Sequence, residues 1–349
     1  MRACLAGIVA GTIAAATTAA VSAQTANLTL TAVNGIKVGH YTLTERPTGC
    51  TAVLVEAGAV AGVDVRGAAP ATAETDLLKP VNLVQQINAV VLSGGSAFGL
   101  DSRSGVMRYL DEKHIGFKAF GNINVPIVSA ASLFDLNVGG NANIRPTADC
   151  GYNAAAAAST QPVAEGNVGA GAGATVGKLG GFDHAMKGGL GTSAIRMPNG
   201  LIVAALVAVN AVGDIIDPAT GKVVAGTRGD SGTTLADART LLLRGALRPA
   251  TPGTNTTLGI IATNATLTKT EATRVAEMAH DGYARAIVPS HTMNDGDAIF
   301  AIATGERKET VDVSQVGSLA ATAIADAVLR AVRQATSIPG YPAARDLTR

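Results

Sequence analysis

Two carboxylates separated by a single glycine, Asp295-Gly296-Asp297, are the residues whose spacing most favours chemistry. Side chains at this spacing can converge from a tight turn at the edge of a strand and act on one reacting group. The same three residues also fit an ordinary solvated turn. The motif alone leaves both interpretations open.

Other motifs that could carry chemistry fail on their spacing. Gly94–Gly99 resembles a turn that presents a nucleophilic serine, but Phe98 replaces the glycine required two residues after Ser96. We interpret Ser96 as a helix N-cap instead. The alternating Gly/Ala run at 168–174 lacks the Gly-Lys-Ser/Thr ending of a phosphate loop. The five histidines have no metal-ligand spacing with cysteine or acidic residues, so we expect no metal and no other cofactor.

The composition describes a chain that can bury a large core. Of its 349 residues, 47% are hydrophobic and 15% are charged, which excludes a disordered or coiled-coil protein. A formal charge of +1 gives no general attraction to nucleic acid or to anionic lipid, so neither is expected as a partner. The 41 glycines have no fixed period, which excludes collagen and suits many tight turns.

Strand-like and helix-like segments alternate along the chain. This order predicts layered α and β structure in one globular unit. The expected strands are 51–56, 89–92, 201–209, 258–262 and 298–303, and the expected helices are 96–114, an amphipathic segment with Val275 to Ala286 on one face, and a last helix from Val316 to Ala331. Residues 217–255 are rich in Pro, Gly and Thr, with one helix expected near 235–247 and an exposed loop at 249–255.

The N-terminal segment predicts export. Arg2 is followed by an uncharged run that ends at Val21-Ser22-Ala23, which is typical of a signal peptide cleaved after Ala23, although an uncleaved membrane anchor is the alternative. The domain would then span residues 24–349, in the periplasm or outside the cell. Cys50 and Cys150 would remain, either as one disulfide or as two buried thiols.

Several unusual segments, in one order, resemble a known family. It is the self-cleaving amidohydrolase family that contains L-aminopeptidase D-Ala-esterase/amidase, the β-peptidyl aminopeptidases and the nylon-oligomer (6-aminohexanoate-oligomer) hydrolase. The Thr and Asp-Gly-Asp pattern is most similar to the last of these. The segments are 61–70 (AGVDVRGAAP), 75–78 (TDLL), 92–101 (LSGGSAFGLD), 168–178 (VGAGAGATVGK), 206–214 (LVAVNAVGD) and 256–264 (TTLGIIATN).

The resemblance implies a four-layer α/β/β/α sandwich whose precursor cuts itself once. The matching junction is Asn255-Thr256, which would give chains of residues 24–255 and 256–349, with Thr256 as N-terminal nucleophile. A free α-amine, with a pKa of about 7.7 to 8.0, is a ready general base for a weakly nucleophilic hydroxyl. Gly191-Thr192 and Gly232-Thr233 are competing junctions, but neither precedes the expected buried strand.

The remaining roles follow from the resemblance residue by residue. Asp295 and Asp297 match the pair that orients or polarises the nucleophile. Asn210 matches a donor to the developing oxyanion, and Lys178 matches a lysine whose charge helps to keep the amine neutral. Tyr152 matches a tyrosine at the substrate pocket.

The implied activity is hydrolysis of amide bonds through an acyl-enzyme. The substrates would be short peptides, including β-peptides, or oligomers of ω-amino acids such as 6-aminohexanoate. The alternatives are a β-peptidyl or D/L-aminopeptidase and esterase, or an acetyl-transferring enzyme of the ornithine acetyltransferase type. An exported chain argues against the transferase, because its substrates are cytoplasmic. The resemblance also implies a homo-oligomer, a tetramer of cleaved protomers.

Overall fold

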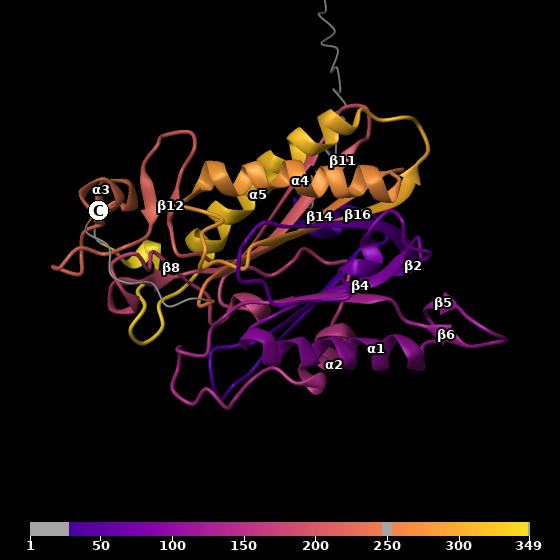
Figure 1. The fold of residues 1–349 in the computed structure, drawn as a ribbon, viewed down its shortest axis with the longest axis horizontal. Coiled ribbons are helices and arrows are strands. Elements are labelled where there is room, and N and C mark those ends of the chain that lie inside the picture. The colour runs from indigo at the N-terminus through magenta and orange to yellow at the C-terminus, as the bar shows by residue number, and fades with distance from the viewer. Residues whose placement is uncertain (1–27, 246–252, 348–349) are drawn as a thin grey trace, which may run out of the picture.

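Two layers of β-strands lie between two pairs of helices in the computed structural model, which describes residues 28–245 and 253–347 (Figure 1). The helices α1 (Ser102–Glu112) and α2 (Ala148–Ala156) cover one outer face, and α4 (Lys269–Ala286) and α5 (Val313–Gln334) cover the other. The expected α/β/β/α sandwich is confirmed.

One long strand joins the two layers. The first part of β2 (Gly49–Val65) pairs with β4, and its last part pairs with β16, with a register shift between Leu54 and Ala59. The first layer contains, in order, β1 (Lys37–Thr42), the start of β2, β4 (Ile87–Ser93), β7 (Val128–Ser132) and β3 (Thr72–Ala73). The second contains β10 (Gly189–Arg196), β11 (Ile202–Asn210), β14 (Thr256–Ala265), β16 (Ala298–Arg307) and the end of β2.

Side chains that point to alternate faces of the strands form three apolar layers. Val53 and Leu92 face Leu206 and Phe300 between the two sheets. On the outer faces, the intervening residues of the first sheet pack under α1 and α2, and those of the second pack under α4 and α5. The strands of the second sheet are therefore buried on both faces, which explains the continuous apolar run predicted at 201–209.

Shorter elements surround this sandwich. The short strands are β5 (Phe117–Lys118), β6 (Asn124–Val125), β8 (Thr175–Val176), β9 (Met186–Lys187), β12 (Asp214–Ile216), β13 (Val223–Ala225) and β15 (Ile287–Val288). The helix expected near 235–247 is α3 (Ala238–Arg244), which Asp237 caps. Residues 246–252 of the expected loop, and the expected signal peptide, lie outside the described residues.

The segment predicted as one helix at 96–114 begins differently. Residues Ser96–Asp101 form a 3-10 helix before α1, and the residue before it, Gly95, has a left-handed backbone with φ of 89°. The interpretation of Ser96 as an N-cap is therefore wrong: Ser96 lies inside the turn with φ of 55°, and no side chain caps it. The left-handed geometry at two consecutive residues turns the chain sharply away from β4.

The two remaining cysteines form a disulfide. Cys50 on β2 and Cys150 on α2 are joined, with their Cα atoms 6.0 Å apart, so this helix is tied to the sheet it covers. Among the described residues, α5 alone is long and apolar enough to cross a membrane. It is mostly buried against β10, β11 and α4, as the core helix of a folded domain is.

Candidate active site

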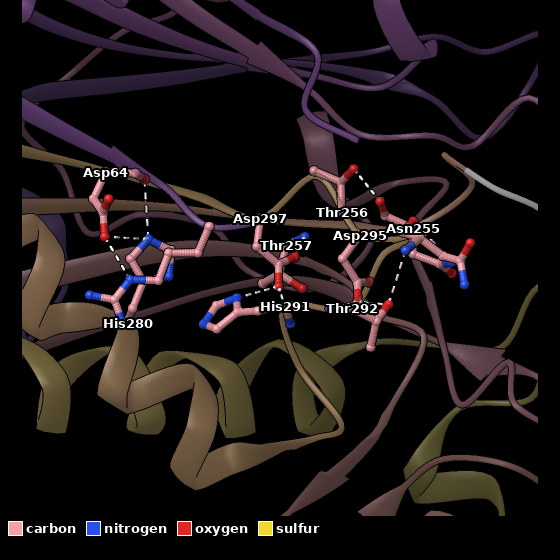
Figure 2. Close-up of polar contacts among 11 residues, drawn as sticks. Asp64, Asn255, Thr256, Thr257, His280, His291, Thr292, Asp295 and Asp297 are labelled. Carbon is pink, nitrogen blue, oxygen red and sulfur yellow. Dashed lines mark hydrogen bonds and ion pairs between the residues drawn. The ribbon is translucent and has the colours of Figure 1, made fainter. Parts of the chain in front are cut away.

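Two parallel strands begin side by side and bring Thr256 to the Asp-Gly-Asp motif (Figure 2). β14 pairs with β16 from Leu258 and Ala298 onwards, and a further bridge joins Asn255 to Asp295. This register sets Thr256 beside Gly296. The turn that precedes β16 therefore lies against the expected cleavage junction. Asn255, Thr256, Asp295 and Gly296 are all buried.

The carbonyl of Asn255 lies between two donors. The Thr256 hydroxyl donates to this carbonyl oxygen at very close range, and the Gly296 N–H donates to it at 3.0 Å. A Cβ on Gly296 would lie 2.7 Å from Thr256 Oγ1 and 2.6 Å from Ala69 O, so no other residue fits without a shift. The hydroxyl and a backbone N–H thus converge on one peptide carbonyl.

The two aspartates bind different donors. Asp297 Oδ1 accepts from the Thr257 N–H at 2.7 Å, and its Oδ2 accepts from His291 N and Nδ1 at 3.1 and 2.9 Å. Asp295 Oδ2 accepts from the N–H and the hydroxyl of Thr292 at 2.9 and 2.6 Å. Both aspartates are 2% exposed, so the solvated-turn interpretation of this motif is wrong.

Asn210 and Lys178 complete the buried polar cluster. Asn210 pairs with Thr256 across β11 and β14, and its Nδ2 donates to Phe134 O at 2.9 Å. Lys178 Nζ donates to Asn210 Oδ1 at 2.9 Å and to Thr254 O at 3.4 Å. The amide of Asn210 carries a second N–H, which leaves a donor besides the one bound to Phe134.

Burial shifts two titrating groups in this cluster towards neutral pH. Burial and the charge of Asp297 raise the pKa of Asp295 to about 6, although the Thr292 donors and Lys178 oppose the shift. Burial lowers the pKa of Lys178 to about 7, against Asp295, Asp297 and Asp135. Perturbed groups around one carbonyl are a physical mark of a catalytic site.

Comparison with known proteins identifies the family. Residues 29–345 match the model of peptidase family S58. The chain belongs to this family. An uncharacterised aminopeptidase of Mycobacterium bovis is 42% identical over 344 residues, which cover 91% of this chain and 97% of that protein. The 6-aminohexanoate-oligomer endohydrolase of a Kocuria strain is 30% identical over 321 residues, covering 86% and 84%.

A solved structure has a similar fold. The L-aminopeptidase D-Ala-esterase/amidase of Ochrobactrum anthropi, a variant of the Ntn hydrolase fold, aligns with a TM-score of 0.66 at 19% identity. The alignment covers 90% of this chain and 89% of that one. The family match thus places this chain in peptidase family S58, and the solved structure shows that the fold is shared.

Tyr152 is not part of the S58 site cluster. It lies on α2, where its hydroxyl donates to Glu112 Oε2 at 2.8 Å and its ring packs under the Arg108 guanidinium, 4.5 Å from the ring centroid. Within the protomer, this tyrosine joins α2 to α1 on an outer layer, and its expected role at the substrate pocket stays a prediction.

The competing junctions lack the geometry of Asn255-Thr256. Thr192 lies in the middle of β10, where its hydroxyl donates to Ala205 O at 2.7 Å and its own N–H binds Glu165. Thr233 lies in an exposed turn beside Ser231. Neither hydroxyl contacts the carbonyl of its preceding glycine in the described structure.

The sequence analysis assigned no role to three residues that contact the aspartates or the Asn255 carbonyl. They are His291, Thr292 and Gly296. The histidines were tested only for metal-ligand spacing, and no group of three metal-ligating side chains occurs among the described residues. The position of His291 and Thr292 just before the Asp-Gly-Asp motif was the available signal.

Proposed function

We propose that this S58 peptidase matures by cutting itself between Asn255 and Thr256 and then hydrolyses amide bonds through an acyl-enzyme on Thr256. The observation that most directly supports this proposal is that the Asn255 carbonyl accepts hydrogen bonds from the Thr256 hydroxyl and the Gly296 N–H. The first is the nucleophile expected for an acyl shift, and the second can stabilise the oxyanion that the shift creates.

The proposed cut proceeds in two steps. Thr256 Oγ forms a bond to the Asn255 carbonyl carbon, the peptide C–N bond breaks, and the hydroxyl proton passes to the nitrogen, which becomes the α-amine of Thr256. Water then hydrolyses the ester, which leaves a carboxylate on Asn255 and restores the hydroxyl. The Asp297 bond to Thr257 N–H holds the new N-terminus in register during both steps.

The mature site would use the same groups on a substrate amide. The α-amine accepts the hydroxyl proton and then delivers it to the leaving amine. Gly296 N–H and the remaining N–H of Asn210 supply the oxyanion donors. Asp295 and Asp297 hold the N-terminal residue, and Lys178 orients Asn210 through its bond to Oδ1.

Two substrate classes follow from the relatives. The mycobacterial protein is named as an aminopeptidase, which supports short peptides with a free amino terminus. The Kocuria protein is named for 6-aminohexanoate oligomers, which supports amides of ω-amino acids. Both substrate classes present an unhindered amide and could share one acyl-enzyme chemistry.

Export and assembly are part of the proposal. The expected signal peptide at 1–23 would take the chain to the periplasm or the medium, and the Cys50–Cys150 disulfide supports an oxidising compartment. The expected tetramer of cleaved protomers stays a prediction. Native mass spectrometry of purified protein measures that assembly directly.

A processing experiment tests the mechanism. Purified wild-type protein should give two bands on a denaturing gel, and N-terminal sequencing of the smaller should begin at Thr256. Thr256→Ala should remain a single chain and be inactive, because it lacks the attacking oxygen. Thr233→Ala is the matched control at a competing Gly-Thr pair, and it should be cut at the wild-type rate.

The activity assay separates hydrolase from transferase. We expect amine release from a 6-aminohexanoate oligomer or a β-dipeptide, and no acetyl transfer from an acetylornithine analogue to glutamate. Active protein that stays one chain would rule out the proposed mechanism.

A further inference from the structure

The turn before β16 points two consecutive residues at two carboxylates (Figure 2). His291 gives its backbone N–H and its ring Nδ1 to Asp297 Oδ2, and Thr292 gives its backbone N–H and its hydroxyl to Asp295 Oδ2. Each residue therefore binds one aspartate twice.

The backbone of this turn is suited to hold anions. His291 has φ of 57°, a left-handed conformation that few residues other than glycine and asparagine adopt readily. Successive N–H groups around such a residue form a concavity that binds negative charge. The unusual φ thus places the two N–H groups where they can reach neighbouring carboxylates.

Packing fixes the orientation of the His291 ring. The ring lies edge-on to His280 at 4.8 Å between centroids and is tilted against Tyr283 at 6.0 Å. His280 is itself held, because its Nε2 lies 3.1 Å from Asp64 O on β2. Since Asp297 accepts at Oδ2, the proton of the His291 imidazole sits on Nδ1.

The two aspartates accept different numbers of hydrogen bonds. Asp297 accepts three hydrogen bonds, counting the one from Thr257 N–H. Asp295 accepts two, both at Oδ2, and no described residue donates to its Oδ1. Both oxygens of Asp297 thus accept hydrogen bonds, whereas Asp295 keeps Oδ1 for the reacting groups.

We propose that His291 and Thr292 are positioning residues for the reaction at Thr256, a clamp that holds Asp297 against the Thr257 N–H and leaves Asp295 Oδ1 free for the N-terminal residue. The clamp rests on the proposed function. It extends that proposal to two residues that do not touch the nucleophile.

Replacement of His291 tests the ring donor. Asparagine keeps a donor near the Nδ1 position and tolerates positive φ, whereas glycine keeps the backbone freedom but removes the donor. We expect His291→Asn to stay within about threefold of the wild-type kcat, and His291→Gly to lose about 10- to 100-fold in kcat with little change in KM. Added imidazole should restore part of the glycine variant's kcat.

A matched histidine serves as control. His40 Nδ1 lies 3.0 Å from the Thr51 hydroxyl, on the other sheet and without a carboxylate partner. His40→Gly should leave kcat unchanged, and imidazole should have no effect on it. A His291→Gly protein that folds, matures and keeps the wild-type kcat would overturn the proposal, as would an imidazole response equal to that of His40→Gly.

Replacement of Thr292 tests the second half of the clamp by pH. Thr292→Val removes the hydroxyl at nearly constant shape, and Thr292→Ser retains it. The charged groups that face Asp295 are Asp297 and Lys178. Because the Thr292 hydroxyl helps to lower the pKa of Asp295, its loss should move the limb of the kcat profile near pH 6 to higher pH in the valine variant only. Coincident profiles for the two variants would contradict the clamp.

Failure of the His291 and Thr292 predictions can be distinguished from failure of the proposed nucleophile. If wild-type protein is uncut and Thr256→Ala keeps activity, the proposed function fails, whatever the clamp variants do. If wild type is cut and active but the His291 and Thr292 variants match it, the clamp alone fails.

Discussion

At the scale of single residues, the proposed reaction needs a base to remove the proton of the Thr256 hydroxyl, because a threonine hydroxyl is a weak nucleophile. The expected base, the α-amine, exists only after the proposed cut. The structure holds Lys178 in a buried position where its pKa falls to about 7. A free α-amine titrates at about 7.7 to 8.0. As the pH falls, the amine is therefore protonated before Lys178 becomes charged.

This order changes what Lys178→Met should do in cleaved protein. The sequence suggested a charged lysine that keeps the amine neutral, which predicts a rising limb moved to higher pH in the variant. With a largely neutral lysine, the limb should move by less than about 0.3 pH units. The value of kcat should still fall by about tenfold, because Asn210 Oδ1 loses the Lys178 donor and keeps only those of Thr175. A limb raised by a full unit in the rate at limiting substrate would mean that Lys178 stays charged.

The sequence predicted the reactive side chains of the site better than the residues that bind them. Asp295 and Asp297 could be singled out by spacing, and Thr256 by the resemblance. The contacts of His291 could not be foreseen, because they depend on a left-handed residue and on rings from α4 that are close only in the fold. The place of Tyr152 on an outer layer could not be foreseen either, because a short local match does not say which layer its helix will cover.

At the scale of elements, the site depends on two parallel strands that start in register. β14 begins at Thr256 itself, and β16 begins directly after Asp297. Both strands could be predicted as apolar runs, at 258–262 and 298–303, although each is longer in the structure. The bridge between Asn255 and Asp295, which brings the junction to the motif, is a tertiary pairing without a local signal.

Gly296→Ala tests this element-level contact. The new Cβ would meet Thr256 Oγ1 and Ala69 O, so either the hydroxyl or the turn must move. We expect a loss of about 1–3 kcal/mol in the free energy of unfolding, from overpacking. Self-cleavage should slow by at least about 100-fold, since both the attacking oxygen and the Gly296 donor shift. Denaturant unfolding and a time course on denaturing gels measure the two effects, and wild-type cutting would show that the turn adapts freely.

At the scale of the whole molecule, a cut at Asn255-Thr256 would not divide the fold into two bodies. β14 lies between β11 and β16, and β16 in turn pairs with β2, so strands of the later segment fill the middle of the second sheet. The helices α4 and α5 belong to the same later segment and cover that sheet. The two pieces would therefore remain one particle, with a new N-terminus at its centre.

The disulfide stabilises a different part of the molecule. It joins residues 100 positions apart, both of them before the proposed junction, and ties α2 to the first sheet. Closing a loop of this length restricts the unfolded chain, so its loss should cost about 2–4 kcal/mol. We expect the double variant Cys50→Ala/Cys150→Ala, made with Thr256→Ala so that the chain stays intact, to unfold at lower urea than Thr256→Ala alone. Reductant should bring Thr256→Ala towards the double variant and leave the double variant unchanged. The later segment contains no cysteine, so mature protein should give two bands on a denaturing gel even without reductant. Equal urea midpoints for Thr256→Ala and the triple variant would contradict a stabilising disulfide.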